Sequence, residues 1–327
     1  MTKDQPALFE LPAPRIEPAP VRPEAVQLAA ALPKDVSMGA MTWSYKGWQG
    51  SVYAKAHSDQ ELARYGLTAY VQHPLLRLAE LDRTYYEPLT AEVFETYARQ
   101  VPETFRFLVK AQEVCTIERY PLHARYGEKR GQDNPLFLDA EYTTRFVVEP
   151  ALAGLGSRLL TLLFQFPPRD VTEPRVFAAR LQAFLRRLPK TCQYAVELRN
   201  PELLTPEYGA ALAETGAIHC YNAWTAMPSV LQQARMTPRE ARRPLLMRWL
   251  LRPGERFEEA RQRYEPFDKL VAEDQTTRGQ VATLVAKAHA HGVPAFVFVD
   301  NKAEGHAPAS ITLLGQEIVE QLRAFSP

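Results

Sequence analysis

The stretch Tyr194-Ala195-Val196-Glu197-Leu198-Arg199 is an apolar run that closes on charged side chains, and the chain repeats this arrangement. Eight short apolar runs can be counted, and nearly every one ends in a charged or amide-bearing residue. These residues are Glu80, Lys110, Gln165, Glu197, Arg199, Asn222, Arg248, Asp300 and Asn301. In a (β/α)8 barrel the C-terminal ends of all strands meet on one face, where a polar residue at a strand end is typical of a catalytic site.

Segments with helical periodicity separate the apolar runs. Apolar positions in residues 174–188 and 279–289 recur about every 3.6 residues, and three further segments also indicate helices (91–101, 206–215 and 311–325). Alternating strands and helices predict parallel βα units, and eight strands close an α/β barrel of the (β/α)8 TIM type. A doubly wound sheet is the rival fold, but residues 39–45 lack the glycine-rich turn that such a sheet uses to bind dinucleotides.

The N-terminal segment differs from the rest in its proline content. Residues 1–35 hold seven prolines, which remove backbone donors and favour extended chain. We therefore predict a disordered Pro-rich tail over 1–35, interrupted at most by a short helix at 24–31, and a single barrel domain over 36–327.

One connection between predicted strands is unusually long. About 45 residues separate the strand that ends near Ala111 from the one that starts near Leu159, and they are rich in polar and aromatic residues. The connection leaves from the face that carries the strand-end polar groups. It is predicted to act as a lid, with a surface insertion as the alternative.

Composition narrows the class of protein. The formal net charge of +1 argues against a whole-protein electrostatic grip on nucleic acid or on an anionic membrane. No stretch approaches about 18 uninterrupted apolar residues, so no membrane span is expected. Three scattered cysteines (Cys115, Cys192 and Cys220) are poor material for disulfides or a structural zinc site, which favours a cytoplasmic protein.

Six motifs, in order, resemble the YecE-like family, a group of barrels catalogued as domain of unknown function number 72. The resemblance covers residues 38–323, and it implies the barrel fold but no established reaction. The motifs lie at residues 39–48 (with Trp43 and Tyr45), 79–86 (with Glu80 and Tyr86), 105–111 (with Lys110), 163–168 (with Gln165), 195–201 (with Glu197 and Arg199) and 298–309 (with Asn301 and His306).

Two carboxylates are the candidates for acid/base catalysis. Glu197 and Arg199 are two apart on a strand, so their side chains point the same way, and Glu80 closes an earlier strand. Two carboxylates whose environments separate their pKa values can divide the roles of acid and base. The structural alternatives are a buried ion pair that closes the barrel top, and a hydrogen bond from Glu80 to a neighbouring strand end.

The other strand-end residues divide between catalysis and ligand binding. Lys110 is a catalytic candidate, and its ammonium could contact an anion, act as a base or form a Schiff base. The amides of Gln165, Asn222 and Asn301 do not titrate usefully, so they are expected to orient a ligand. Trp43, Tyr45 and Tyr86 are the aromatic candidates, with core packing as the alternative for the tryptophan.

The histidines near the last predicted strand lie on opposite sides of it. His289 and His291 precede the last strand, at the wrong end for the site, whereas His306 follows it and is the one histidine assigned to the site. No zinc motif is present, and no metal or cofactor is predicted; carboxylate-bound magnesium or manganese is the alternative.

Residues 235–263 carry nine arginines against four glutamates. Most of these arginines are expected on a solvated helix face, but Arg248 stands among apolar residues and favours an anionic ligand. The leading hypothesis is an enzyme that acts on a small anionic molecule, phosphate-bearing or sugar-like. A ligand-binding or sensor barrel and a nucleic-acid-associated protein that uses the arginine-rich segment are the alternatives.

A short motif in the tail suggests a protein partner. Gln5, Leu8 and Phe9 are spaced as in the Q-x-x-L-F peptide with which bacterial DNA-handling proteins bind the DNA sliding clamp. Docking of this segment on the barrel itself is the alternative.

Overall fold

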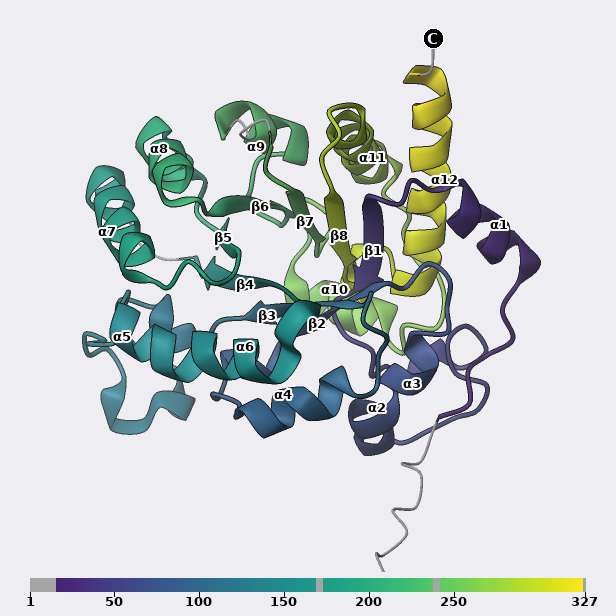
Figure 1. Ribbon diagram of the computed structural model, residues 1–327, viewed down its shortest axis with the longest axis horizontal. Helices are drawn as coiled ribbons and strands as arrows, with labels where there is room; N and C mark the ends of the chain where they lie inside the picture. Colours follow the sequence, from purple (N-terminus) through teal and green to yellow (C-terminus); the bar gives the residue numbers. More distant parts are fainter. Residues whose placement is uncertain (1–15, 169–172, 238–241, 326–327) are drawn as a thin grey trace, which may run out of the picture.

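The computed structural model describes residues 16–168, 173–237 and 242–325, whose strands close into an eight-stranded parallel barrel (Figure 1). Each strand pairs with its neighbours in chain order, and the first closes on the last. The strands are β1 (Val36–Ala40), β2 (Leu78–Leu81), β3 (Arg106–Lys110), β4 (Leu159–Phe166), β5 (Tyr194–Leu198), β6 (Ile218–Ala223), β7 (Leu245–Trp249) and β8 (Ala295–Val299). The predicted (β/α)8 TIM barrel is confirmed.

Helices surround the barrel and follow the predicted segments closely. They are α1 (Pro23–Ala31), α2 (Asp59–Tyr65), α3 (Leu67–Tyr70), α4 (Ala91–Ala98), α5 (Ala140–Thr143), α6 (Glu149–Leu155), α7 (Pro174–Arg187), α8 (Pro206–Thr215), α9 (Val230–Met236), α10 (Phe257–Tyr264), α11 (Gln275–Ala290) and α12 (Ala307–Phe325). α11 begins four residues before the predicted 279, because the Asp274 side chain accepts a hydrogen bond from the Thr277 amide at 3.0 Å and caps the helix there.

Strand alternation divides the apolar residues into two cores. Outward residues such as Val109 and Val196 pack against the helices, whereas inward residues such as Leu108 and Ala195 fill the barrel. Two positions further along five strands the inward residue becomes polar. In strand order the pairs are Leu78 and Glu80, Leu108 and Lys110, Leu163 and Gln165, Ala195 and Glu197, and Leu246 and Arg248. The C-terminal end of the barrel is therefore lined by charged and amide groups above an apolar layer.

Residues 16–35 of the predicted disordered tail have defined structure and pack against the barrel, while the domain boundary at residue 36 stays a prediction. Ile16 is buried and its amide donates to Thr68 Oγ1 at 3.1 Å, while the Ala19 amide donates to Val52 O at 2.9 Å. α1 begins at Pro23 and packs beside α12 (Figure 1). The prolines fix extended chain and start a helix here, and neighbouring elements supply the partners. Gln5, Leu8 and Phe9 lie outside the described residues.

The long connection between β3 and β4 is mostly folded structure. α6 packs against α4 and serves as the barrel helix that follows β3 (Figure 1). The remaining excursion, residues 112–139, is held by its own hydrogen bonds: Asn134 Nδ2 donates to Val114 O and Ile117 O, both at 2.7 Å. Whether this excursion acts as a lid stays a prediction.

The close approach of β1 and β2 at Gly39 gives a test of the barrel. A Cβ atom at this glycine would lie 2.0 Å from Leu78 O, whereas nothing lies within 4 Å of one at Gly209 in α8. We expect Gly39→Ala to lower the free energy of unfolding by about 1–3 kcal/mol. Gly209→Ala is expected to raise it by about 0.5–1 kcal/mol, because alanine favours the helix. Urea unfolding of both variants measures this, and equal stabilities would contradict the close approach.

Candidate active site

Four buried charged side chains form a chain of ion pairs at the C-terminal end of the barrel, which we call the quartet: Glu80, Arg248, Glu197 and Arg199. Arg248 donates from Nε and Nη2 to the two oxygens of Glu80, at 3.1 and 2.9 Å. It also donates from Nη1 to Glu197 Oε2 at 2.5 Å. Arg199 Nε donates to Glu197 Oε1 at 2.5 Å, so the prediction that these two side chains share one side of the strand is confirmed.

The two carboxylates of the quartet have different electrostatic surroundings. Burial raises the pKa of Glu80 to about 7, and Asp82 adds to the shift, while Arg248 opposes it. Burial also acts to raise the pKa of Glu197, but Arg199 and Arg248 together outweigh it, so this pKa is lowered. Glu197 therefore stays ionised, whereas Glu80 exchanges a proton near neutral pH.

A cavity of about 540 Å³ opens beside Glu80, between the C-terminal ends of β1 and β2 and the helices α2 and α4. Glu80 is the one member of the quartet that lines this cavity. The volume of the cavity falls within the range of about 300–1,000 Å³ that is usual for small-molecule sites. The lining residues of this Glu80 cavity are Met41, Thr42, Trp43, Ser44, Gln60, Ala63, Arg64, Glu80, Leu81, Asp82, Arg83, Val93, Thr96 and Tyr97.

Asp82 belongs to the site, although it was not among the predicted site residues. Its Oδ1 accepts a hydrogen bond from Lys110 Nζ at 3.0 Å, and this ammonium lies 3.8 Å from the centre of the Tyr85 ring. Lys110 does not line the Glu80 cavity, but it holds the carboxylate that does. The spacing of Glu80 and Asp82 matches that of Glu197 and Arg199, and this signal could have identified Asp82 from the sequence.

Of the three predicted aromatic residues, the structure brings Trp43 to the cavity. Its Nε1 donates to Ala63 O at 3.3 Å, which leaves the ring in the cavity wall. Tyr45 lies elsewhere, packed between Trp48 and Phe267. Tyr86 is 61% exposed, and it too is absent from the cavity wall.

The three amide residues lie at the same end of the barrel but in different surroundings. Asn301 Oδ1 accepts hydrogen bonds from Trp48 Nε1 at 3.0 Å and from the Ala307 amide at 2.8 Å, so it anchors the start of α12. Asn222 Nδ2 donates to Leu198 O at 3.0 Å. Gln165 pairs in register with Glu197 and is half-buried. Ligand contact by these amides stays a prediction.

His306 is occupied by structural hydrogen bonds. Its Nδ1 accepts from the Ala309 amide at 3.2 Å, which assigns the proton to Nε2, 3.2 Å from Ser51 Oγ. Burial lowers the pKa of His306 to about 4, so the ring is neutral. The Ser51 hydroxyl donates in turn to Trp48 O at 3.0 Å, so this serine and histidine are not arranged as a nucleophile and its base.

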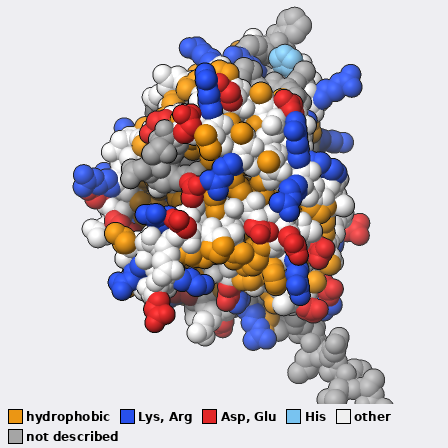
Figure 2. All heavy atoms as spheres, turned by 90° about the vertical axis from the view of Figure 1, so that its left-hand side faces the viewer, with side chains coloured by type: hydrophobic (Ala, Val, Ile, Leu, Met, Phe, Trp, Pro, Cys, Tyr) orange, Lys and Arg blue, Asp and Glu red, His pale blue; other side chains and the backbone are white. Residues whose placement is uncertain are grey.

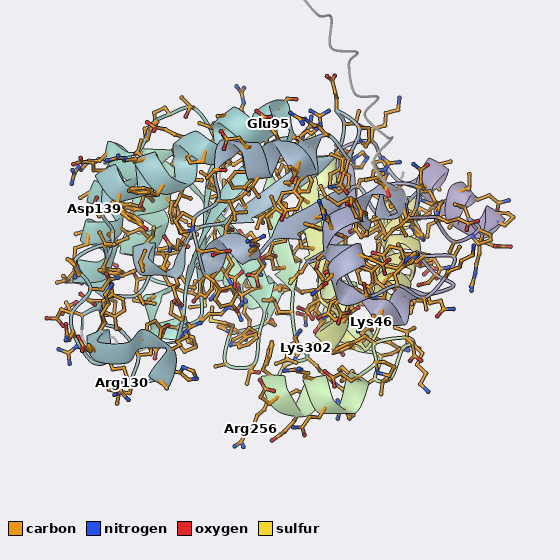
Figure 3. The ribbon with its side chains drawn as sticks, turned by 90° about the horizontal axis from the view of Figure 1, so that it is seen from below. Lys46, Glu95, Arg130, Asp139, Arg256 and Lys302 are labelled. Atoms are coloured by element: carbon orange, nitrogen blue, oxygen red, sulfur yellow. The ribbon has the colours of Figure 1, made fainter. Side chains whose placement is uncertain are left out.

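The exposed arginines at and within α10 form ion pairs with glutamates. Arg256 lies 3.6 Å from Glu259 and Arg261 lies 3.0 Å from Glu265. Figure 3 shows Arg256 at the outer end of α10, whereas Lys302 lies toward the barrel and is buried against Asp300 at 2.8 Å. On the face seen in Figure 2, positive and negative side chains are interspersed. The ion pairs of Arg256 and Arg261 show that α10 has the solvated, ion-paired face that was predicted.

Within residues 16–168, 173–237 and 242–325, no three side chains among His, Cys, Asp and Glu come together in a way that could hold a metal ion. No described helix has the length and apolar character needed to cross a membrane.

The family model described as "Protein of unknown function DUF72" matches residues 37–326. The chain belongs to this family. UPF0759 protein YunF from Bacillus subtilis (strain 168) is 31% identical to this DUF72 chain over 124 residues, which are 37% of the chain and 38% of that relative. The match thus spans about two fifths of the curated relative.

Solved structures of DUF72 family proteins share the fold of the chain. One from Enterococcus faecalis V583 has a TM-score of 0.60 at 18% identity, over 87% of this chain and 95% of its own. One from Thermotoga maritima MSB8 has a TM-score of 0.57 at 21% identity, over 87% and 99%. At these identities the likeness concerns the fold, and the resemblance found in the motifs is confirmed.

The shared guanidinium of Arg248 gives a stability test of the quartet. We expect Arg248→Met to lower the free energy of unfolding by about 3–5 kcal/mol, because it leaves two buried carboxylates without their common partner. The loss should shrink at acidic pH, where both carboxylates are protonated. The exposed Arg261→Met serves as control and should leave stability nearly unchanged. Similar losses of unfolding free energy for the two variants in urea at pH 8 would show that Arg248 contributes no more to stability than an exposed arginine.

Proposed function

We propose that this DUF72 chain is an enzyme in which Glu80 transfers a proton to or from a small molecule bound in the Glu80 cavity. The observation that supports this most is the position of one carboxyl group: it lines a cavity of suitable volume and its pKa is raised to about 7. A general acid or base works best when its pKa lies near the working pH. The substrate class that we propose is small and anionic, phosphate-bearing or sugar-like.

The other members of the quartet act through Glu80. Arg248 contacts both oxygens of Glu80 and so fixes the plane of its carboxyl group. Glu197, ionised and away from the cavity wall, holds Arg248 in place and is a positioning residue in this scheme. Lys110 acts in the same indirect way, through its hydrogen bond to Asp82.

The geometry favours proton transfer over glycoside hydrolysis by Glu80 and Glu197. A glycosidase needs its two carboxyl groups on either side of the scissile bond, with the substrate between them. Here the guanidinium of Arg248 occupies that place, since it bonds to both carboxylates within 3.1 Å. A substrate that reaches Glu80 from the cavity thus meets one carboxyl group of this pair.

A binding or sensor barrel is the second candidate, and the complete pairing of the quartet favours it. All four charges have partners within the protein, as they would in a purely structural cluster. Both candidates use the same cavity, and loss of turnover without loss of binding separates them.

Replacement of Glu80 gives this test. We expect Glu80→Gln to reduce turnover by about 10²-fold or more, the usual contribution of a general acid or base, while binding is retained. Glu95→Gln, on the exposed outer side of α4, is the matched control. Turnover is followed by mass spectrometry of a metabolite extract incubated with each protein. The substrate is the compound that the native chain depletes.

The pH dependence provides an independent check. The rate should change through an ionisation near pH 7, rising with pH if Glu80 is the base and falling if it is the acid. If Glu80→Gln depletes the same compounds at the native rate, the enzyme proposal fails and the binding role is favoured.

A further inference from the structure

The charged groups around the Glu80 cavity are paired within the protein, with one exception among the described residues. Arg83 donates from Nε and Nη2 to Glu87 Oε1 at 2.9 and 2.8 Å. Asp82 is paired with Lys110 at 3.0 Å. Arg64 has no carboxylate within ion-pair distance among the described residues. Its guanidinium carbon lies 5.2 Å from the centre of the Tyr65 ring.

The surroundings of Arg64 explain why its charge is free. It lies in the last turn of α2, where a cation interacts favourably with the helix dipole. The two acidic residues of α2 are engaged at the other end of the helix. Glu61 accepts hydrogen bonds from Ser58, and Asp59 lies 2.7 Å from Lys46. The guanidinium therefore remains at the cavity rim with its donors available.

The arginines that the sequence indicated for anion binding have no spare charge. Arg248 is shared between Glu80 and Glu197, and Arg199 is paired with Glu197 at 2.5 Å and stacked on Trp224 at 4.0 Å. When Glu80 is ionised, the two guanidinium charges and the two carboxylate charges of the quartet cancel. An anionic ligand thus finds its counter-charge at the rim of the cavity.

We propose that Arg64 binds the phosphate group of a small phosphorylated polyhydroxyl compound and so determines which ligands the cavity accepts. Arginine matches the oxygens of a phosphate group with two parallel donors. Thr42, Ser44, Gln60 and Thr96 line the same cavity and supply hydrogen-bonding groups for hydroxyls. The proposal rests on the proposed function, because the other end of this ligand meets Glu80. It adds the chemical class of the ligand and the residue that selects it.

Calorimetric titration at low ionic strength tests the assignment, with ribose 5-phosphate, ribose and inorganic phosphate as probes. We expect the native chain to bind ribose 5-phosphate more tightly than ribose. Arg64→Ala should weaken binding of the phosphorylated probe by about tenfold or more, the usual effect of losing a charged hydrogen bond. Arg83 lines the same cavity, but its charge is already neutralised by Glu87. Arg83→Ala should therefore weaken binding by less than about threefold.

Three results would overturn the proposal: no preference of the native chain for ribose 5-phosphate over ribose at millimolar concentrations, equal losses in the two variants, or unchanged binding in Arg64→Ala. Arg64 is exposed, so its variant should keep the native melting temperature, and this measurement excludes unfolding as the cause of a loss. Glu80→Gln, titrated in parallel, should still bind the probe. Loss of turnover in Glu80→Gln with unchanged binding in Arg64→Ala would retain the proposed function and reject the role of Arg64.

Discussion

The guanidinium of Arg248, shared between two buried carboxylates, is the interaction on which the candidate site depends. Removing a charge from water costs several kcal/mol even after relaxation, so a buried ion persists only with close partners. Arg248 supplies three donors to Glu80 and Glu197, and both carboxylates are almost inaccessible to solvent. Without this residue Glu80 would lose its guanidinium partner, and Glu197 would keep only Arg199.

The difference between the two carboxylates follows from the number of cations near each. Glu197 touches two guanidinium groups, so its charge is well compensated. Glu80 has one, which it shares, and Asp82 lies near it as a further negative group. The barrel also places Glu80 at a cavity and Glu197 away from it. A structural cluster thus leaves one carboxyl group that is nearly buried, borders a cavity and has a pKa raised to about 7.

The sequence was most informative where regular geometry applies. Strand ends and two-residue alternation located Glu80, Glu197, Arg199 and Arg248 at one end of the barrel, because closed parallel strands leave little freedom there. Which of these charges pair with one another depends on barrel closure, which joins residues 168 positions apart in the chain. The anion-binding role expected of Arg248 could not be judged before its two partners were known.

Residues outside the strands were harder to predict. Asn301 and His306 follow β8 as expected, but their polar atoms serve the start of α12, and no strand pattern reports such capping bonds. Arg64 comes from a short helix and enters the cavity wall through the packing of α2, for which the sequence has no periodic signal. The packing of residues 16–35 on the barrel was not predicted, because proline favours both extended segments and helix starts.

Proton transfer at this site requires that the Glu80 carboxyl group titrates near neutral pH. Infrared difference spectroscopy of the protonated carboxyl band, with Glu80→Gln to assign the signal, measures its pKa directly. We expect the Glu80 band to disappear with a midpoint near pH 7. A midpoint at the ordinary value of a glutamate, about 4.3, or no band above pH 5 would contradict this view of the site.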